Sequence, residues 1–167
     1  MIFSSEHEHR LRRIVYLAGF FLHASVAVNA YITSSFFEQF VGESNVGLVY
    51  VLISLFMLTL ALNAQQIVEF SGIRRTIIGA LIASLLTGII MTTWAGAWVG
   101  VIAAILHSAV TYLLVITLDL YLEHLSENKI TGSIRGIYLT IANLAYLVSP
   151  LLSSIALERY GFGAVFA

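Results

Sequence analysis

Charged residues are scarce in this chain. Only 10% of its 167 residues are Asp, Glu, Lys or Arg, against about 25% in an average soluble domain. Eight basic and nine acidic side chains are too few to coat a soluble fold of this size. The net charge of -1 offers no basic patch for nucleic acid. With 59% hydrophobic residues and a mean hydropathy of +0.94, the sequence predicts an integral membrane protein surrounded by lipid.

Cysteine is absent, which excludes a disulfide framework, thiol catalysis and a thiolate metal site. Catalytic motifs are missing as well: there is no Gly-x-Ser-x-Gly elbow, no His-Glu-x-x-His and no phosphate-binding glycine loop. An intramembrane hydrolase or acyltransferase that used His107 would lack acid-base partners in the sequence pattern. No carboxylate lies at the depth of the intramembrane histidines. We therefore expect no enzyme, no cofactor and no metal site.

Five apolar runs are each long enough to cross about 30 Å of hydrocarbon as a helix. They lie at about 14–37, 46–68, 76–93, 97–122 and 134–157, and a sixth begins near 162 in "GFGAVFA". The runs are continuous rather than alternating, which excludes a membrane β-barrel. The uncharged run 14–37 is longer than a signal-peptide core, and four more follow it. The predicted fold class is an all-α polytopic membrane bundle, with a tail at 1–13 and a membrane domain at 14–167.

The distribution of cations predicts the orientation of the bundle. With the N-terminus in the cytoplasm, seven of the eight cations face inward and only Arg159 faces outward. The seven are Arg10, Arg12, Arg13, Arg74, Arg75, Lys129 and Arg135. This asymmetry favours a cytoplasmic N-terminus in a plasma (inner) membrane.

The stretch "EFSGIRRT", residues 69–76, is a polar island between the second and third runs. It resembles the signature of the major facilitator superfamily of transporters, a Gly-x-x-x-Asp-Arg-x-Gly-Arg-Arg pattern between the second and third helices. Aligned on Gly72, Glu69 takes the acidic position. Arg74 and Arg75 supply the basic pair about one place late.

Two later stretches resemble the same family in the same order along the chain. "LDLYLEHLSENKITGSIRGIYLTIANLAYLVSPLLSS" is similar to the family's path from helix four to helix five. "SPLLSSIALERYGFGAVFA" resembles the segment that ends helix five with Gly-Pro-x-x-Gly-Gly and enters helix six. Pro150 is kept, and Ser149, Ser153 and Ser154 stand in place of the glycines.

The chain also departs from the family pattern. Gln65 and Phe70 replace the first glycine and the first arginine of the signature. Val99 lies near the place where proton-coupled members carry an arginine in helix four, so the resemblance does not extend to proton coupling. The family builds two six-helix halves around a central cavity. The resemblance therefore implies a second six-helix half, either a missing C-terminal part or another chain.

Polar residues inside the runs follow helical stripes, as ionisable or polar groups turned away from lipid do. His23 lies on a small and polar stripe of the first run, and His107 lies on a similar stripe of the fourth. Each could line a substrate path, or be a hydrogen-bonded histidine between packed helices. Pro150 removes a backbone donor and is predicted to bend its helix. The substrate-path candidates are His23, Ser34, His107, Thr111, Thr140 and Asn143.

The resemblance also implies a conformational latch, in which the loop after helix two holds the end of helix four. Its candidates are Glu69, Gly72, Arg74, Arg75 and Asp119. We expect Asp119 to pair with Arg74 or Arg75, since a guanidinium can hold a carboxylate with two bonds. The alternative is that the two arginines only fix the topology of the hairpin.

The expected function follows from topology and resemblance together. The chain is expected to be part of a secondary active transporter that moves a small solute by alternating access. The expected partners are membrane lipid, an unidentified small solute and the second half, with no nucleic acid. The alternative is a small non-transporting membrane protein that scaffolds or modulates partner membrane proteins through its helix faces.

Overall fold

The structure of the chain is a computed structural model that describes residues 2–93, 98–125 and 131–166. Helices account for nearly all of these residues, and the described part contains no strand, which confirms the all-α prediction. The helices are α1 (Ile2–Val41), α2 (Glu43–Ser71), α3 (Ile73–Thr93), α4 (Trp98–His124) and α5 (Thr131–Phe166).

Five segments are long and apolar enough to cross a membrane, which confirms the five predicted spans. They run over Arg10–Val41, Glu43–Ser71, Ile73–Thr93, Trp98–His124 and Gly132–Gly161. A helix suits such segments because every backbone N–H and C=O inside hydrocarbon must find a partner within the protein. The helices extend beyond several predicted boundaries. In particular, residues 2–13, which were predicted to form a tail before the first span, belong to α1, which begins at Ile2.

Glycines with positive φ mark the breaks between helices. Gly42 (φ 74°) separates α1 from α2, and Gly72 (φ 82°) separates α2 from α3. Gly161 (φ 74°) interrupts the helical dihedrals inside α5, close to the predicted start of the sixth run near 162. Residues with a side chain rarely adopt this region of φ. Pro150 lies inside α5, and the break in the helical dihedrals of α5 comes at Gly161.

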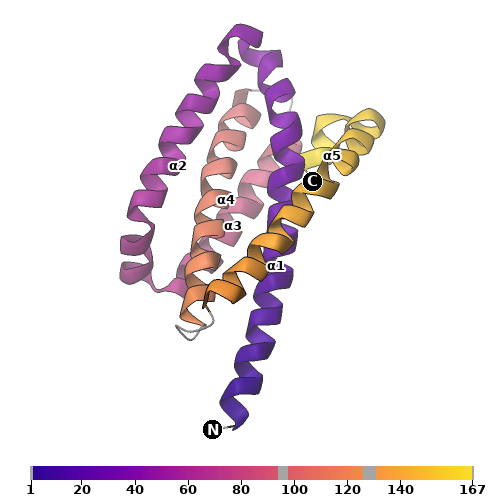
Figure 1. Ribbon diagram of the computed structural model, residues 1–167. Helices are drawn as coiled ribbons and strands as arrows, with labels where there is room; N and C mark the ends of the chain where they lie inside the picture. The colour runs from indigo at the N-terminus through magenta and orange to yellow at the C-terminus, as the bar shows by residue number, and fades with distance from the viewer. Residues whose placement is uncertain (1, 94–97, 126–130, 167) are drawn as a thin grey trace.

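The helices run up and down between two ends of the bundle (Figure 1). The N-terminus and the turn between α2 and α3 lie at one end, called here the N-terminal end, and the turn at Gly42 lies at the other. α1 packs most extensively against α5, and α3 packs against α4, while α2 contacts α4 more than it contacts its chain neighbours. The pairing of α1 with α5 joins the two ends of the chain, whereas α3 and α4 are consecutive helices.

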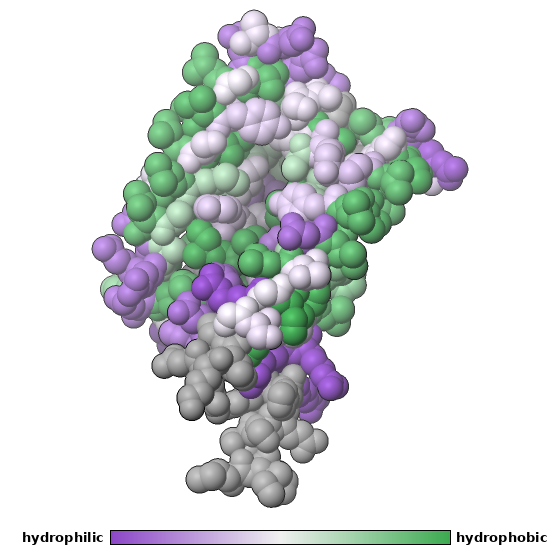
Figure 2. Space-filling model, viewed as in Figure 1, coloured by the Kyte–Doolittle hydropathy of each residue, from purple (hydrophilic) through white to green (hydrophobic). Residues whose placement is uncertain are grey.

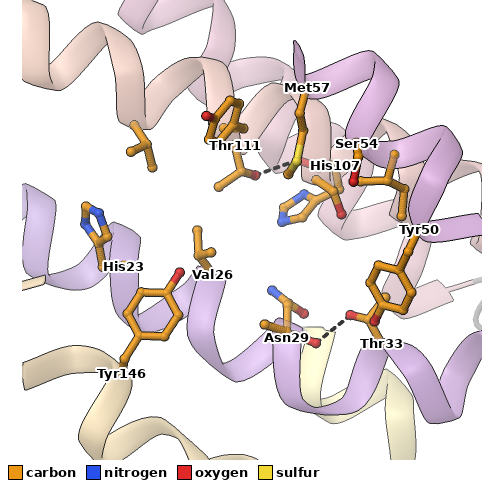
Figure 3. Close-up of a pocket in the computed structure, with 15 residues that line it drawn as sticks. His23, Val26, Asn29, Thr33, Tyr50, Ser54, Met57, His107, Thr111 and Tyr146 are labelled. Carbon is orange, nitrogen blue, oxygen red and sulfur yellow. Dashed lines mark hydrogen bonds between the residues drawn. The ribbon is translucent and has the colours of Figure 1, made fainter. Parts of the chain in front are cut away.

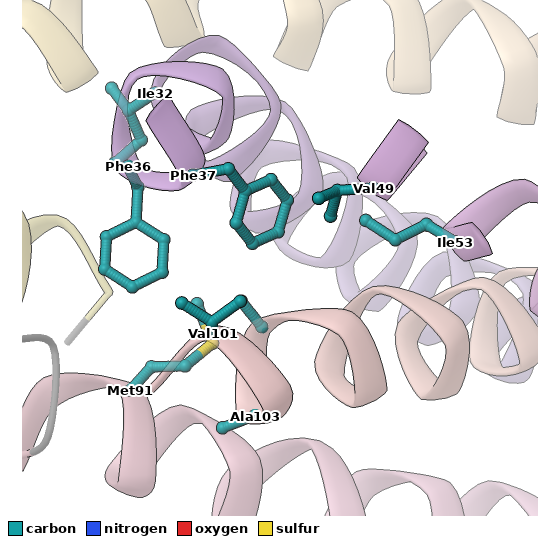
Figure 4. Packing of buried hydrophobic residues seen from close by; sticks show 9 residues of the cluster. Ile32, Phe36, Phe37, Val49, Ile53, Met91, Val101 and Ala103 are labelled. Carbon is teal, nitrogen blue, oxygen red and sulfur yellow. The ribbon is translucent and has the colours of Figure 1, made fainter. Parts of the chain in front are cut away.

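Apolar side chains close the bundle at both ends. Toward the Gly42 turn, the core combines residues of four helices around the fully buried Phe36 and Phe37 (Figure 4). At the N-terminal end, a smaller core joins α1, α4 and α5 through Val15, Leu122 and Tyr138. Between these two cores, the centre of one face is open.

Candidate functional site

A hollow of about 360 Å³ opens in the face of the bundle between α2 and α5. Figure 2 shows this face recessed at its centre, where paler and purple side chains replace the green of the rims. α1, α2 and α4 supply its walls, and Tyr146 of α5 completes them (Figure 3). None of the lining residues is Asp, Glu, Lys or Arg. The hollow is thus uncharged but carries polar side chains.

His23 lies in the wall that α1 contributes, near the middle of that helix. Its Nδ1 lies 2.8 Å from the carbonyl oxygen of Gly19. A carbonyl only accepts hydrogen bonds, so Nδ1 carries the proton and Nε2 presents a lone pair. The ring is held edge-on between Tyr138 and Tyr146, with centroid distances of 5.6 Å and 6.4 Å. These contacts fix the imidazole in one orientation.

His107 of α4 has the same tautomer for a different reason. Its Nδ1 lies 3.2 Å from the carbonyl oxygen of Ser84 and 3.0 Å from the hydroxyl of Thr87, both on α3. The Thr87 hydroxyl donates to its own helix, so it can accept from Nδ1. Nε2 of His107 then presents a lone pair, as in His23. Neither Nε2 has a hydrogen-bond partner among the described residues.

Many polar side chains within the helices form hydrogen bonds to the backbone of their own helix. The hydroxyls of Thr59, Ser108 and Thr111 donate to the carbonyl four residues earlier, and so does the amide of Asn63. Such bonds let a polar residue face lipid or a neighbour at little cost. Asn29 is different: its Nδ2 donates to the carbonyl of Ser25, but its buried Oδ1 has no hydrogen-bond partner in the described structure. Asn29 also lines the hollow.

Three of the six substrate-path candidates line the hollow, and the other three are exposed residues outside its lining. His23, His107 and Thr111 line the hollow together. Ser34 is exposed on α1 and interacts with the hydroxyl of Tyr50, which is part of the wall. Thr140 and Asn143 are exposed on α5 and are not among the lining residues, and Thr140 donates to the carbonyl of Gly136.

The structure adds lining residues that the sequence analysis did not single out. They include Asn29 and Thr33 of α1, Tyr50, Ser54 and Met57 of α2, and Tyr112 and Tyr146. A signal for some of them exists. Asn29 and Thr33 stand four residues apart, as do Tyr50 and Ser54, so each pair shares one face of its helix. Tyr146 gives no such signal, because only the packing of α5 against α1 brings it to the hollow.

Asp119 has a different partner from the one predicted. Arg135 of α5 donates two bonds to its carboxylate, from Nη2 to Oδ2 at 2.6 Å and from Nε to Oδ1 at 3.1 Å. The predicted pairing with Arg74 or Arg75 is therefore wrong for this conformation. The bidentate geometry was expected, but the arginine comes from the start of α5 rather than from the α2–α3 turn.

The remaining latch candidates lie at the end of α2 and the start of α3, and Figure 1 shows the turn between these helices at the N-terminal end. Among the described residues, no ion pair joins Asp119 to Arg74 or Arg75. Arg74 and Arg75 are exposed in the first turn of α3. Glu69 accepts a hydrogen bond from Nε2 of Gln65 on its own helix. Gly72 caps α2, since its N–H donates to the carbonyl of Val68 at 2.8 Å. In this structure the island 69–76 therefore serves as a helix-to-helix turn.

Comparisons with known proteins do not extend this description: no protein-family model, no curated protein and no solved structure matches the chain. Among the described residues, no group of three or more His, Asp or Glu side chains is placed to hold a metal ion. Function is therefore inferred from the hollow and from the charged residues at the N-terminal end of the bundle.

Proposed function

We propose that the chain forms part of a secondary active transporter that moves a small solute by alternating access, and that the hollow is part of the solute path. The observation that carries this proposal is the position of the hollow. It lies between the two apolar cores, near the middle of membrane-spanning helices, and its walls include two imidazoles whose Nε2 atoms have no partner among the described residues. Polar groups are costly in hydrocarbon, so their convergence on one recess favours a path for solute.

The resemblance of "EFSGIRRT" and of the two later stretches to the major facilitator superfamily supports the same function. In that family the hollow of one half faces the hollow of the other. A second six-helix half, from the same protein or from another chain, would cover the open face and complete the path. The cation distribution supports a cytoplasmic N-terminus in a plasma membrane, with Arg74, Arg75 and Arg135 on the cytoplasmic side.

Cysteine labelling tests whether water reaches the hollow. The chain has no cysteine, so each substitution introduces the only thiol of this chain. Ala30→Cys lies in the wall, whereas Ile82→Cys is an exposed position on α3, which does not line the hollow. We expect a hydrophilic thiosulfonate to modify Ala30→Cys at least about tenfold faster in membranes, because the reactive thiolate needs water to form.

Two results separate the proposal from its alternative. Fast labelling at Ala30→Cys alone supports an aqueous path. Equal, slow labelling at both positions would contradict the path and would favour a non-transporting protein that scaffolds partners through its apolar faces. Labelling of a second wall position, Ser54→Cys on α2, shows whether the result at position 30 holds for the hollow as a whole.

A further inference from the structure

Two acceptors without partners shape the chemistry of the hollow. They are Nε2 of His23 and Nε2 of His107, and both residues line the same recess. In each imidazole Nδ1 is already within hydrogen-bond distance of a backbone carbonyl. Hydroxyls of the lining, such as those of Ser54, Tyr112 and Tyr146, can donate or accept, whereas each Nε2 can only accept. A ligand that donates a hydrogen bond is therefore favoured.

The ligand must also be uncharged. The lining contains no Asp, Glu, Lys or Arg that could pair with an ion. An ion that left water for this recess would lose its hydration without a compensating countercharge.

The walls favour a flat aromatic ring. Tyr50, Tyr112 and Tyr146 line the hollow beside the two imidazoles, and Met57 contributes a thioether. Aromatic rings pack edge-to-face or offset against one another, and sulfur contacts ring edges favourably. The volume of about 360 Å³ lies at the lower end of the range of about 300–1,000 Å³ for small-molecule sites. A molecule of one or two fused rings fits this volume.

We infer that the hollow binds a neutral aromatic molecule of one or two rings that donates a hydrogen bond, with the Nε2 atoms of His23 and His107 as the acceptors. This inference names the substrate class of the proposed transporter and rests on that function. A lipid chain, the other candidate occupant, offers no donor and would leave both Nε2 atoms unpartnered.

Indole and 1-methylindole provide a matched pair of probes. They have nearly the same shape, but only indole has an N–H. The readout is protection of Ala30→Cys from the thiosulfonate, with the 167-residue chain in lipid nanodiscs. We expect indole to protect at a concentration about five- to tenfold lower than 1-methylindole. The added methyl group makes 1-methylindole the more lipid-soluble probe, so greater partition into the nanodisc cannot produce this order.

Charged probes and variants complete the test. Tryptamine, a cation, and indole-3-acetate, an anion, should protect more weakly than indole. The paired variant His23→Leu/His107→Leu should lower the advantage of indole over 1-methylindole to about twofold or less. The control pair His23→Gln/His107→Gln places an amide oxygen near each Nε2 and should keep most of that advantage.

The outcomes are distinguishable. Equal protection by indole and 1-methylindole, or stronger protection by either charged probe, would overturn the inference without any substitution of the two histidines. Such a result would leave the transport proposal standing if the hollow is reached by water. Slow labelling of Ala30→Cys with no probe present would instead contradict the transport proposal itself.

Discussion

Substitution of alanine for Gly19 is expected to lower the free energy of unfolding by about 1–3 kcal/mol. Gly19 is buried where α1 crosses α5, and the ring of Tyr138 lies directly over it. A Cβ at Gly19 would overlap Cε2 of Tyr138 and would lie 3.2 Å from both Cδ2 and Cζ. Tyr138 is only 2% exposed and has no room to move, so the two helices must separate. Thermal unfolding in detergent micelles measures the loss.

Gly79→Ala is the matched control for this substitution. Gly79 also lies inside a helix, but a Cβ there would meet nothing within 4 Å, so this change should be neutral or slightly stabilising. The double variant Gly19→Ala/Tyr138→Ala should lose less stability than the sum of its two single variants, because the second change removes the ring that clashes. Equal stability of Gly19→Ala and Gly79→Ala would show that α1 and α5 do not approach as closely as described.

Loss of either partner of the Asp119–Arg135 pair should destabilise the N-terminal end of the bundle by about 1 kcal/mol. The side chains of Arg135 and Asp119 are 43% and 30% exposed, so solvent screens part of their attraction. Their two bonds nevertheless join the end of α4 to the start of α5. Asp119→Asn and Arg135→Gln should each lower the unfolding temperature in detergent, and by less at high salt.

A charge swap provides the control for this prediction. Asp119→Arg/Arg135→Asp reverses both charges and should restore more than half of the stability that either single variant loses. Arg75→Gln is a matched loss of an exposed arginine at the same end, and it should have little effect. If Arg75→Gln lowered the stability as much as Arg135→Gln, the result would contradict this pairing and would favour an ion pair between Asp119 and the α2–α3 turn.

The sequence predicted the spans well because the hydrophobic runs contain nearly all the information needed. Runs of adequate length and the polar breaks between them fix how many helices form and roughly where each ends. Which helices pack together was not predictable in this way. The contact of α1 with α5 depends on the small residue Gly19, which allows close approach, and the pattern of one helix does not identify its partner.

The same limit explains which site residues were found. His23 and His107, which the helical stripes singled out, line one recess, and their role in a substrate path stays a prediction. Asn143 is exposed and is not among the lining residues, since helical spacing alone does not say which face of a helix is inside. The sequence analysis used Arg135 only as one of the cations that predict the orientation of the bundle. Its pairing with Asp119 depends on where α5 begins relative to the end of α4.

The central claim is that the hollow is a solute path open to each side of the membrane in turn. The most direct test is the sidedness of labelling at Ser54→Cys, an exposed position in the wall, in the assembled transporter. A membrane-impermeant thiosulfonate is applied to whole cells and, separately, to inverted membrane vesicles. Alternating access predicts modification from both sides, because each conformation exposes the hollow to one of them. Modification from one side only, or from neither, would contradict the account.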